Sequence, residues 1–336
     1  MRGGPAFRAG AISIIRSPAP SPEKPELFVR RMLLREAMPV QKGLSASRPK
    51  KTLYQLLEPY LFLLPALLIF AVFLYYPFGR TIYLSTWVTN ALGQPKKYVG
   101  FDNYTIRLFG KTEFWASIGS TMKFVVVVAF GGLLIGIITS LLTYNRYKGS
   151  GFCAAVYAMP LAIASAAASM AFRMIYHPTG GLLNNLMGTQ INWLGGQYQF
   201  WSIALVTVWL QSGINFIFIS AGLKSVPSDL YESCSIDGAN YWQKLWYITI
   251  PAISPTLFFQ IIINIINAFQ SFSQVKLLTN ESPSSSTNLI VFAIWHDAFR
   301  ANRFETAAAR SVVLFVIILV ITLIQFSFEK RSVNYS

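Results

Sequence analysis

Residues 231–255 have the sequence YESCSIDGANYWQKLWYITIPAISP, which forms a polar, acidic insert between two long apolar runs. Glu232 and Asp237 precede Gly238, and Pro251 stands where the next apolar run begins. Glycine interrupts helices and proline marks their boundaries, so the pattern predicts a short helix, a glycine turn and a second short helix. A helix–turn–helix on the water side of a membrane protein predicts a docking element for a partner.

The composition places the chain in a membrane. Of its 336 residues, 54% are hydrophobic and 12% are charged, whereas soluble domains carry about 25% charged residues. The apolar segments run unbroken for about 20 residues rather than alternating over about 10, which favours helices over a barrel. We therefore expect an all-α, polytopic membrane protein.

Six apolar segments are long enough to be transmembrane helices. They cover residues 60–78, 124–144, 152–172, 200–223, 248–275 and 311–328. Six spans place both termini and the insert on one side, where 17 basic residues fall against ten on the other. The positive-inside rule then assigns both termini to the cytoplasm. Gly132 and Gly136 in the second span predict close helix contact.

The N-terminal segment differs from the rest of the chain. Residues before 52 carry 11 of the 28 Lys and Arg residues, and residues 1–37 have no apolar run long enough for a signal peptide. We expect residues 1–53 to be a disordered cytoplasmic tail, with Met38 a possible true start. The membrane domain then covers residues 54–334, with the insert at 224–247. This distribution favours retention of charge in the cytoplasm over nucleic-acid binding.

The sequence carries no recognisable enzyme or metal motif. The two histidines, His177 and His296, lack catalytic partners at motif spacing, and the two cysteines lack CxxC spacing. Gly110-Lys111-Thr112 resembles the end of a phosphate loop, but Thr105 stands where the first glycine is needed. We expect no enzymatic activity, no metal and no cofactor bound by this chain. Uphill transport would need energy from elsewhere.

Amide and hydroxyl side chains follow the fifth span. Their spacing of 4, 3, 4 and 3 residues predicts a single helix face, made of Gln260, Asn264, Asn267, Ser271 and Gln274. Gln211 and Asn215 form a shorter face on the fourth span. Unpaired amides in lipid cost several kcal/mol, so these faces meet protein or a water-filled cavity. Two interpretations stay open: a pathway for a sugar or neutral polyol, or hydrogen bonds between helices.

Lys123 and Arg173 are the charges closest to the predicted hydrocarbon region. Both lie near span ends, from which long basic side chains can reach the interface. Contact of either residue with the solute would favour an anionic group such as a phosphate.

The insert resembles the cytoplasmic signature loop of permease subunits in bacterial binding-protein-dependent ABC importers. That signature begins E-A-A-x-x-D-G-A and continues to an apolar residue and a proline. The matching residues here are Glu232, Asp237, Gly238, Ala239, Ile250 and Pro251. Ser233 and Cys234 replace the two alanines. Segments 158–160, 222–227 and 307–312 resemble the carbohydrate and glycerol-phosphate branch of the family.

The resemblance implies a type I ABC importer permease with six transmembrane helices and a cytoplasmic coupling helix–turn–helix. It implies cytoplasmic ATPase subunits that use ATP, a second homologous permease subunit, and an extracellular or periplasmic solute-binding protein. These partners would assemble in the lipid bilayer of a bacterial plasma membrane. The solute would be a sugar or a polyol phosphate such as glycerol 3-phosphate.

An ion-coupled secondary transporter of a small polar solute is the alternative. Such a protein normally carries intramembrane acids for ion coupling. None of the six predicted spans contains Asp or Glu, which counts against this alternative.

Overall fold

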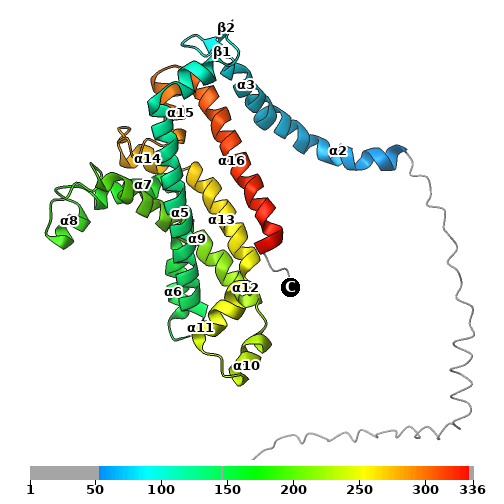
Figure 1. Ribbon diagram of the computed structural model, residues 1–336, viewed down its shortest axis with the longest axis vertical. Coiled ribbons are helices and arrows are strands. Elements are labelled where there is room, and N and C mark those ends of the chain that lie inside the picture. Colours follow the sequence, from blue (N-terminus) through cyan, green and yellow to red (C-terminus); the bar gives the residue numbers. More distant parts are fainter. Residues whose placement is uncertain (1–52, 145–146, 333–336) are drawn as a thin grey trace, which may run out of the picture. The chain divides into compact units, whose positions relative to one another are not determined.

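The computed structural model describes residues 53–144 and 147–332 (Figure 1). Residues 1–52 of the predicted tail, including Met38, lie outside the described residues. The chain divides into two units after Ala66, and each is described by itself. The first helical stretch is built from α2 (Leu53–Phe70), the π-helical η1 (Ala71–Tyr75) and α3 (Tyr76–Ser85). It contains the first candidate span, in which every residue from 60 to 80 is exposed.

A small hairpin and two short helical turns follow α3. They are β1 (Trp87–Thr89), β2 (Pro95–Tyr98), α4 (Asp102–Tyr104) and η2 (Thr105–Phe109), with the strands antiparallel. Helix α5 (Thr112–Tyr144) contains the second predicted span but begins well before residue 124. Its first turns carry the polar residues Ser117 and Thr121, which are buried against protein. The hydropathy of the sequence located the apolar part of α5 but not its polar first turns, so the predicted span begins later than the helix.

The third predicted span is broken into α6 (Ser150–Ala158), η3 (Met159–Ala162) and α7 (Ser165–Ile175), with a bend of 105°. Ile163 and Ala164 leave the helical conformation and have extended backbone. Pro160 stands in η3, and a proline cannot donate to the helical hydrogen-bond ladder. The break rests on α9, where a Cβ added at Gly213 would lie 2.8 Å from the Leu161 nitrogen.

The central helix of the 67–336 unit is α9 (Tyr198–Ser225), which matches the fourth predicted span and follows the short α8 (Leu182–Met187). It packs along α5 through the predicted small-residue face. Gly132 and Gly136 are buried, and a Cβ added at Gly136 would lie 2.4 Å from the Asn215 Cβ. The expected close helix contact is confirmed.

The predicted helix, glycine turn and second helix are confirmed in the insert. Helix α10 (Ser228–Ile236) ends at a turn in which Gly238 has φ +79°. Helix α11 (Tyr241–Lys244) begins with a capping box between Asn240 and Gln243. The chain continues through η4 (Leu245–Thr249) and α12 (Ile250–Ala252), then bends by 67° into α13 (Ser254–Phe269). Pro251 and Pro255 flank this bend.

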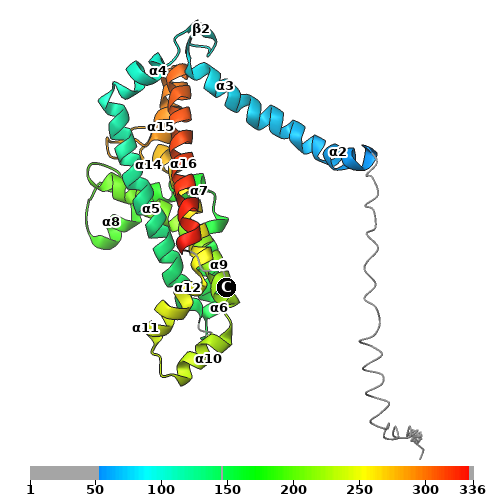
Figure 2. The ribbon, with the colours of Figure 1, turned by 45° about the vertical axis from the view of Figure 1, so that its right-hand side comes forward.

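Four elements complete the chain: α14 (Ser273–Leu278), α15 (Ile290–Trp295), η5 (His296–Arg300) and α16 (Phe304–Ser332). Helix α16 contains the sixth predicted span. Among the described residues, four helices are long and apolar enough to cross a membrane, or up to six if each bent pair is one span. Within the 67–336 unit, α10 and α11 lie at one end and β1, β2 and α15 at the other (Figures 1 and 2).

Candidate functional site

Three of the predicted pathway residues form a buried cluster of amides between α5, α9 and α13, the amide cluster. Asn215 and Asn264 exchange two hydrogen bonds, Nδ2 to Oδ1 in each direction, both 3.0 Å long. Gln260 donates a third, of 3.2 Å, to Asn215 Oδ1. All three side chains are 0% exposed. At these positions the interpretation as hydrogen bonds between helices describes the geometry.

The other four predicted pathway residues line a separate cavity of about 350 Å³, the amide pocket. Its polar lining consists of Thr207, Gln211, Asn267, Gln270, Ser271 and Gln274, together with Ser165 and Ser273. Within the part of the chain that the structure describes, no charged residue lines it. Lys123 and Arg173 therefore do not take part in this cavity.

The predicted single face is wrong for Ser271 and Gln274, because α13 ends at Phe269. The Phe272 N–H donates to Gln270 O at 2.8 Å, and the chain enters α14 after this turn. This break brings Gln270 to the cavity, a residue that a helical period excluded. Its signal in the sequence is the run of polar residues 270–271 after an apolar helix.

The amide pocket borders two irregular segments. One is the break after α13, and the other is the break between α6 and α7, which contributes Pro160, Leu161 and Ile163. Irregular backbone in a membrane is tolerated where it is buried in protein or lines a cavity. The two breaks therefore occur where the physical chemistry permits them.

The candidate coupling residues lie at the opposite end of the α9–α13 region. Glu232, Asp237 and Gly238 are exposed, Ala239 is half-buried, and Ile250 and Pro251 lie half-buried in α12. Among the described hydrogen bonds and ion pairs, none involves the carboxylate of Glu232. None involves the carboxylate of Asp237 either, and only its backbone N–H is used, in the contacts that end α10. Both acids are thus available to a partner.

Large apolar side chains are exposed in the same segment of the chain. Ile236 is 87% exposed, and Trp242, Trp246 and Tyr247 are also exposed. The two short helices are held together by Lys244 Nζ, which donates to Ser235 Oγ at 2.6 Å. A fixed knob with exposed aromatic and acidic groups is a surface suited to docking.

Residues 132–333 match the family described as binding-protein-dependent transport system inner membrane component. The chain belongs to this family. The permease is 32% identical over 298 residues to the sn-glycerol-3-phosphate transport system permease protein UgpA of Yersinia enterocolitica, covering 87% of this chain and 100% of the relative. It is 29% identical to the protein of the same name from Agrobacterium fabrum, over 82% of this chain and 96% of the relative.

Two solved structures resemble the permease. One, of a bacterial ABC transporter that imports the acidic polysaccharide alginate, has a TM-score of 0.74 and 23% identity, over 84% of this chain and 99% of that one. The second, of a bacterial alginate transporter with a pentasaccharide-bound periplasmic protein, has a TM-score of 0.73 and 25% identity, over 83% and 97%.

These findings place the permease among the inner-membrane, multi-pass subunits of ABC importers. It is a transport component and not an enzyme. Permeases of this family work with an ATPase and a binding protein. The ion-coupled transporter alternative receives no support from the relatives.

Proposed function

We propose that the permease moves a sugar or a polyol phosphate, such as glycerol 3-phosphate, inward through the amide pocket. The observation that carries this proposal is an amide-lined cavity, with no charged residue among its described lining, that borders the break between α6 and α7 and the end of α13. The relatives named as glycerol-3-phosphate permeases and the alginate importers support a hydroxyl-rich solute.

Amides suit such a solute because each one both donates and accepts hydrogen bonds, as hydroxyl groups do. Asn267 and Gln270 are exposed within the described residues, and Gln211 Oε1 is buried without a hydrogen-bond partner. Gln211 therefore retains bonding capacity that a solute hydroxyl or a small shift of its side chain would satisfy. The charge-free lining fits the hydroxyl-bearing part of the solute.

The α10–α11 knob is proposed to dock into a separate ATPase, through Glu232, Asp237, Gly238 and Ala239. This assigns the knob and both termini to the cytoplasm and the hairpin end to the side of the binding protein. ATP would be bound by the ATPase, and this chain would hold no cofactor. A second, homologous permease subunit would cover part of the exposed apolar surface of residues 60–80.

The coupling assignment is tested by Gly238→Val in the assembled importer. Gly238 has φ +79° and no atom within 4 Å of an added Cβ, so the change strains the turn by about 1–2 kcal/mol without an internal clash. ATP-driven uptake should fall at least about tenfold, because the altered turn no longer fits the ATPase. A loss of about 1.4 kcal/mol in binding free energy is a tenfold loss of affinity. Membrane insertion should be unchanged.

Gly188→Val is the matched control. Gly188 also has positive φ, +63°, and open space around its Cβ, but it lies after α8 rather than in the knob. Uptake should be retained in this variant. Equal uptake by the two variants would remove the assignment of residues 231–239 to ATPase coupling.

A further inference from the structure

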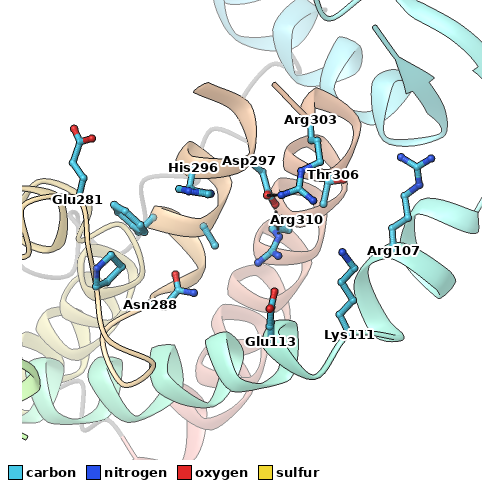
Figure 3. Close-up of a pocket in the computed structure, with 13 residues that line it drawn as sticks. Arg107, Lys111, Glu113, Glu281, Asn288, His296, Asp297, Arg303, Thr306 and Arg310 are labelled. Atoms are coloured by element: carbon cyan, nitrogen blue, oxygen red, sulfur yellow. Dashed lines mark ion pairs between the residues drawn. The ribbon is translucent and has the colours of Figure 1, made fainter. Parts of the chain in front are cut away.

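A second cavity, the charged pocket, lies at the hairpin end of the structure. It has a volume of about 310 Å³ and is lined by residues from η2, the start of α5, the 281–288 loop, α15, η5 and α16. The charged residues of its lining are Arg107, Lys111, Glu113, Glu281, Asp297, Arg303 and Arg310 (Figure 3). It shares no residue with the amide pocket.

Arg310 is the most informative group in the charged pocket. Its side chain is 10% exposed, and its Nε lies 2.8 Å from Asp297 Oδ2 without the alignment of a hydrogen bond. The guanidinium also lies over the Phe114 ring, 5.8 Å from the ring centre. No hydrogen bond from either terminal nitrogen is found among the described residues. The ion pair with Asp297 thus leaves the terminal nitrogens of Arg310 able to donate to a further acceptor.

Further positive charge comes from the rim of the charged pocket. Lys111 is exposed and makes no ion pair within the described residues, while Arg107 and Arg303 retain exposed surface beside their partners Glu305 and Asp297. Lys111 immediately precedes α5, a helix of 33 residues whose N-terminus adds partial positive charge. Together these groups present donors from three elements to one cavity.

Two of the three described acids that line the charged pocket are already paired with basic residues. Asp297 already serves both Arg303 and Arg310. Glu281 is taken by Arg300 and Lys276, and the hydrogen bond from Arg300 is the largest cause that lowers the pKa of this carboxyl group. Glu113 projects from α5 toward Arg310 and, of the acids in this lining, is the one without an ion pair to any described residue (Figure 3).

We infer that the charged pocket is a binding site for a phosphate-type oxyanion. Arg310 would pair with two oxygens in the planar fork geometry that guanidinium groups offer. Lys111 and the α5 N-terminus would supply the remaining positive field, and Glu113 would oppose binding. The anion could be inorganic phosphate or the phosphate group of a polyol phosphate. Only a link between this ligand and the transported solute rests on the proposed function; the site itself does not.

Titration of the purified full-length chain in detergent, at constant ionic strength, tests the site. The probes are inorganic phosphate, glycerol 3-phosphate and glycerol, followed by calorimetry and by the shift in melting temperature. Phosphate should bind and raise the melting temperature, and glycerol should not. Stronger binding of glycerol 3-phosphate than of inorganic phosphate would identify the organic ester as the preferred source of the oxyanion.

Variants separate specific binding from general attraction to a basic protein. Arg310→Gln should weaken phosphate binding at least about tenfold, because it removes charge-assisted hydrogen bonds. Lys111→Gln changes an exposed side chain without affecting folding, and should weaken binding severalfold. Glu113→Gln should strengthen binding. Lys97→Gln, on the exposed strand β2 outside the pocket, is the control and should leave affinity unchanged.

The site is overturned if phosphate fails to bind the unmodified chain, or if Lys97→Gln weakens binding as much as Lys111→Gln. Uptake by the assembled importer is a separate readout. If the unmodified chain does not bind phosphate while the importer takes up its solute normally, the site is removed and the proposed transport function stands. Phosphate binding by the purified chain, with no uptake of any polyol by the importer, would keep the site and remove the proposed transport function.

Discussion

The amide cluster and the amide pocket contain similar side chains from neighbouring positions, yet their surroundings differ. In the cluster, Asn215 and Asn264 pair with each other and Gln260 joins them, so their hydrogen-bonding groups are largely used within the protein. In the pocket, Asn267 is exposed although it follows Asn264 by a single helical turn. The difference comes from the end of α13 at Phe269, beyond which the chain no longer packs as a helix against α5 and α9.

A line of amides along one helix can therefore serve two different roles. The amides near the middle of α13 fix its position against α5 and α9. Those at its end meet a cavity. We therefore expect substitutions in the cluster to reduce stability, and substitutions in the pocket to reduce transport.

The largest loss of stability is expected from Gly136→Val, which disrupts the contact between α5 and α9 beside the amide cluster. The new Cβ would lie 2.4 Å from the Asn215 Cβ and 3.2 Å from its carbonyl carbon. Overpacking of this kind costs about 1–3 kcal/mol, and backbone contact places Gly136 at the upper end. Thermal unfolding in detergent measures the effect. Gly119→Val on the same helix, where nothing lies within 4 Å, should be close to neutral.

A smaller loss is expected from Asn264→Leu. The change removes both hydrogen bonds with Asn215 and the one to Ala129 O. Hydrogen bonds between membrane helices are worth about 0.6 kcal/mol each on average, so the cost should be about 1–2 kcal/mol. The melting temperature should fall. A variant as stable as the unmodified protein would show that the cluster does not fix these helices.

The smallest effect on stability is expected from Asn267→Leu. Asn267 donates and accepts no side-chain hydrogen bond among the described residues and is exposed to the cavity, so stability should change by less than about 0.5 kcal/mol. Uptake should nevertheless fall severalfold, or its solute range should shift, because a solute hydroxyl loses a partner. Unchanged transport in an assembled importer would make this part of the pocket structural only.

Much of the fold could be predicted from the sequence. Long apolar runs located α9 and α16, and Gly132 with Gly136 predicted the contact between α5 and α9. The glycine turn at Gly238 was predicted because few other residues adopt its φ of +79°. Hydropathy and local turn chemistry suffice for features of this kind.

The remainder depends on tertiary packing, which a periodic pattern does not contain. The bend of 105° after Pro160 is stabilised by contact with Gly213, on a different helix. The end of α13 divided the amides into two sites, although their spacing predicted one face. Arg310 and Lys111 are far apart in sequence, and their approach depends on how α16 packs beside α5.

Cysteine accessibility tests the division between cluster and pocket most directly. Cys153 and Cys234 are first replaced by serine, and Asn264→Cys, Asn267→Cys and Gln270→Cys are made separately in the assembled importer. A water-soluble thiol reagent should label the variants at 267 and 270, which are exposed at the amide pocket, and the transported solute should slow that labelling. The variant at 264 should resist labelling. Equal labelling at 264 and 267, or labelling at 267 and 270 that the solute does not slow, would contradict the assignment of the amide pocket as the solute pathway.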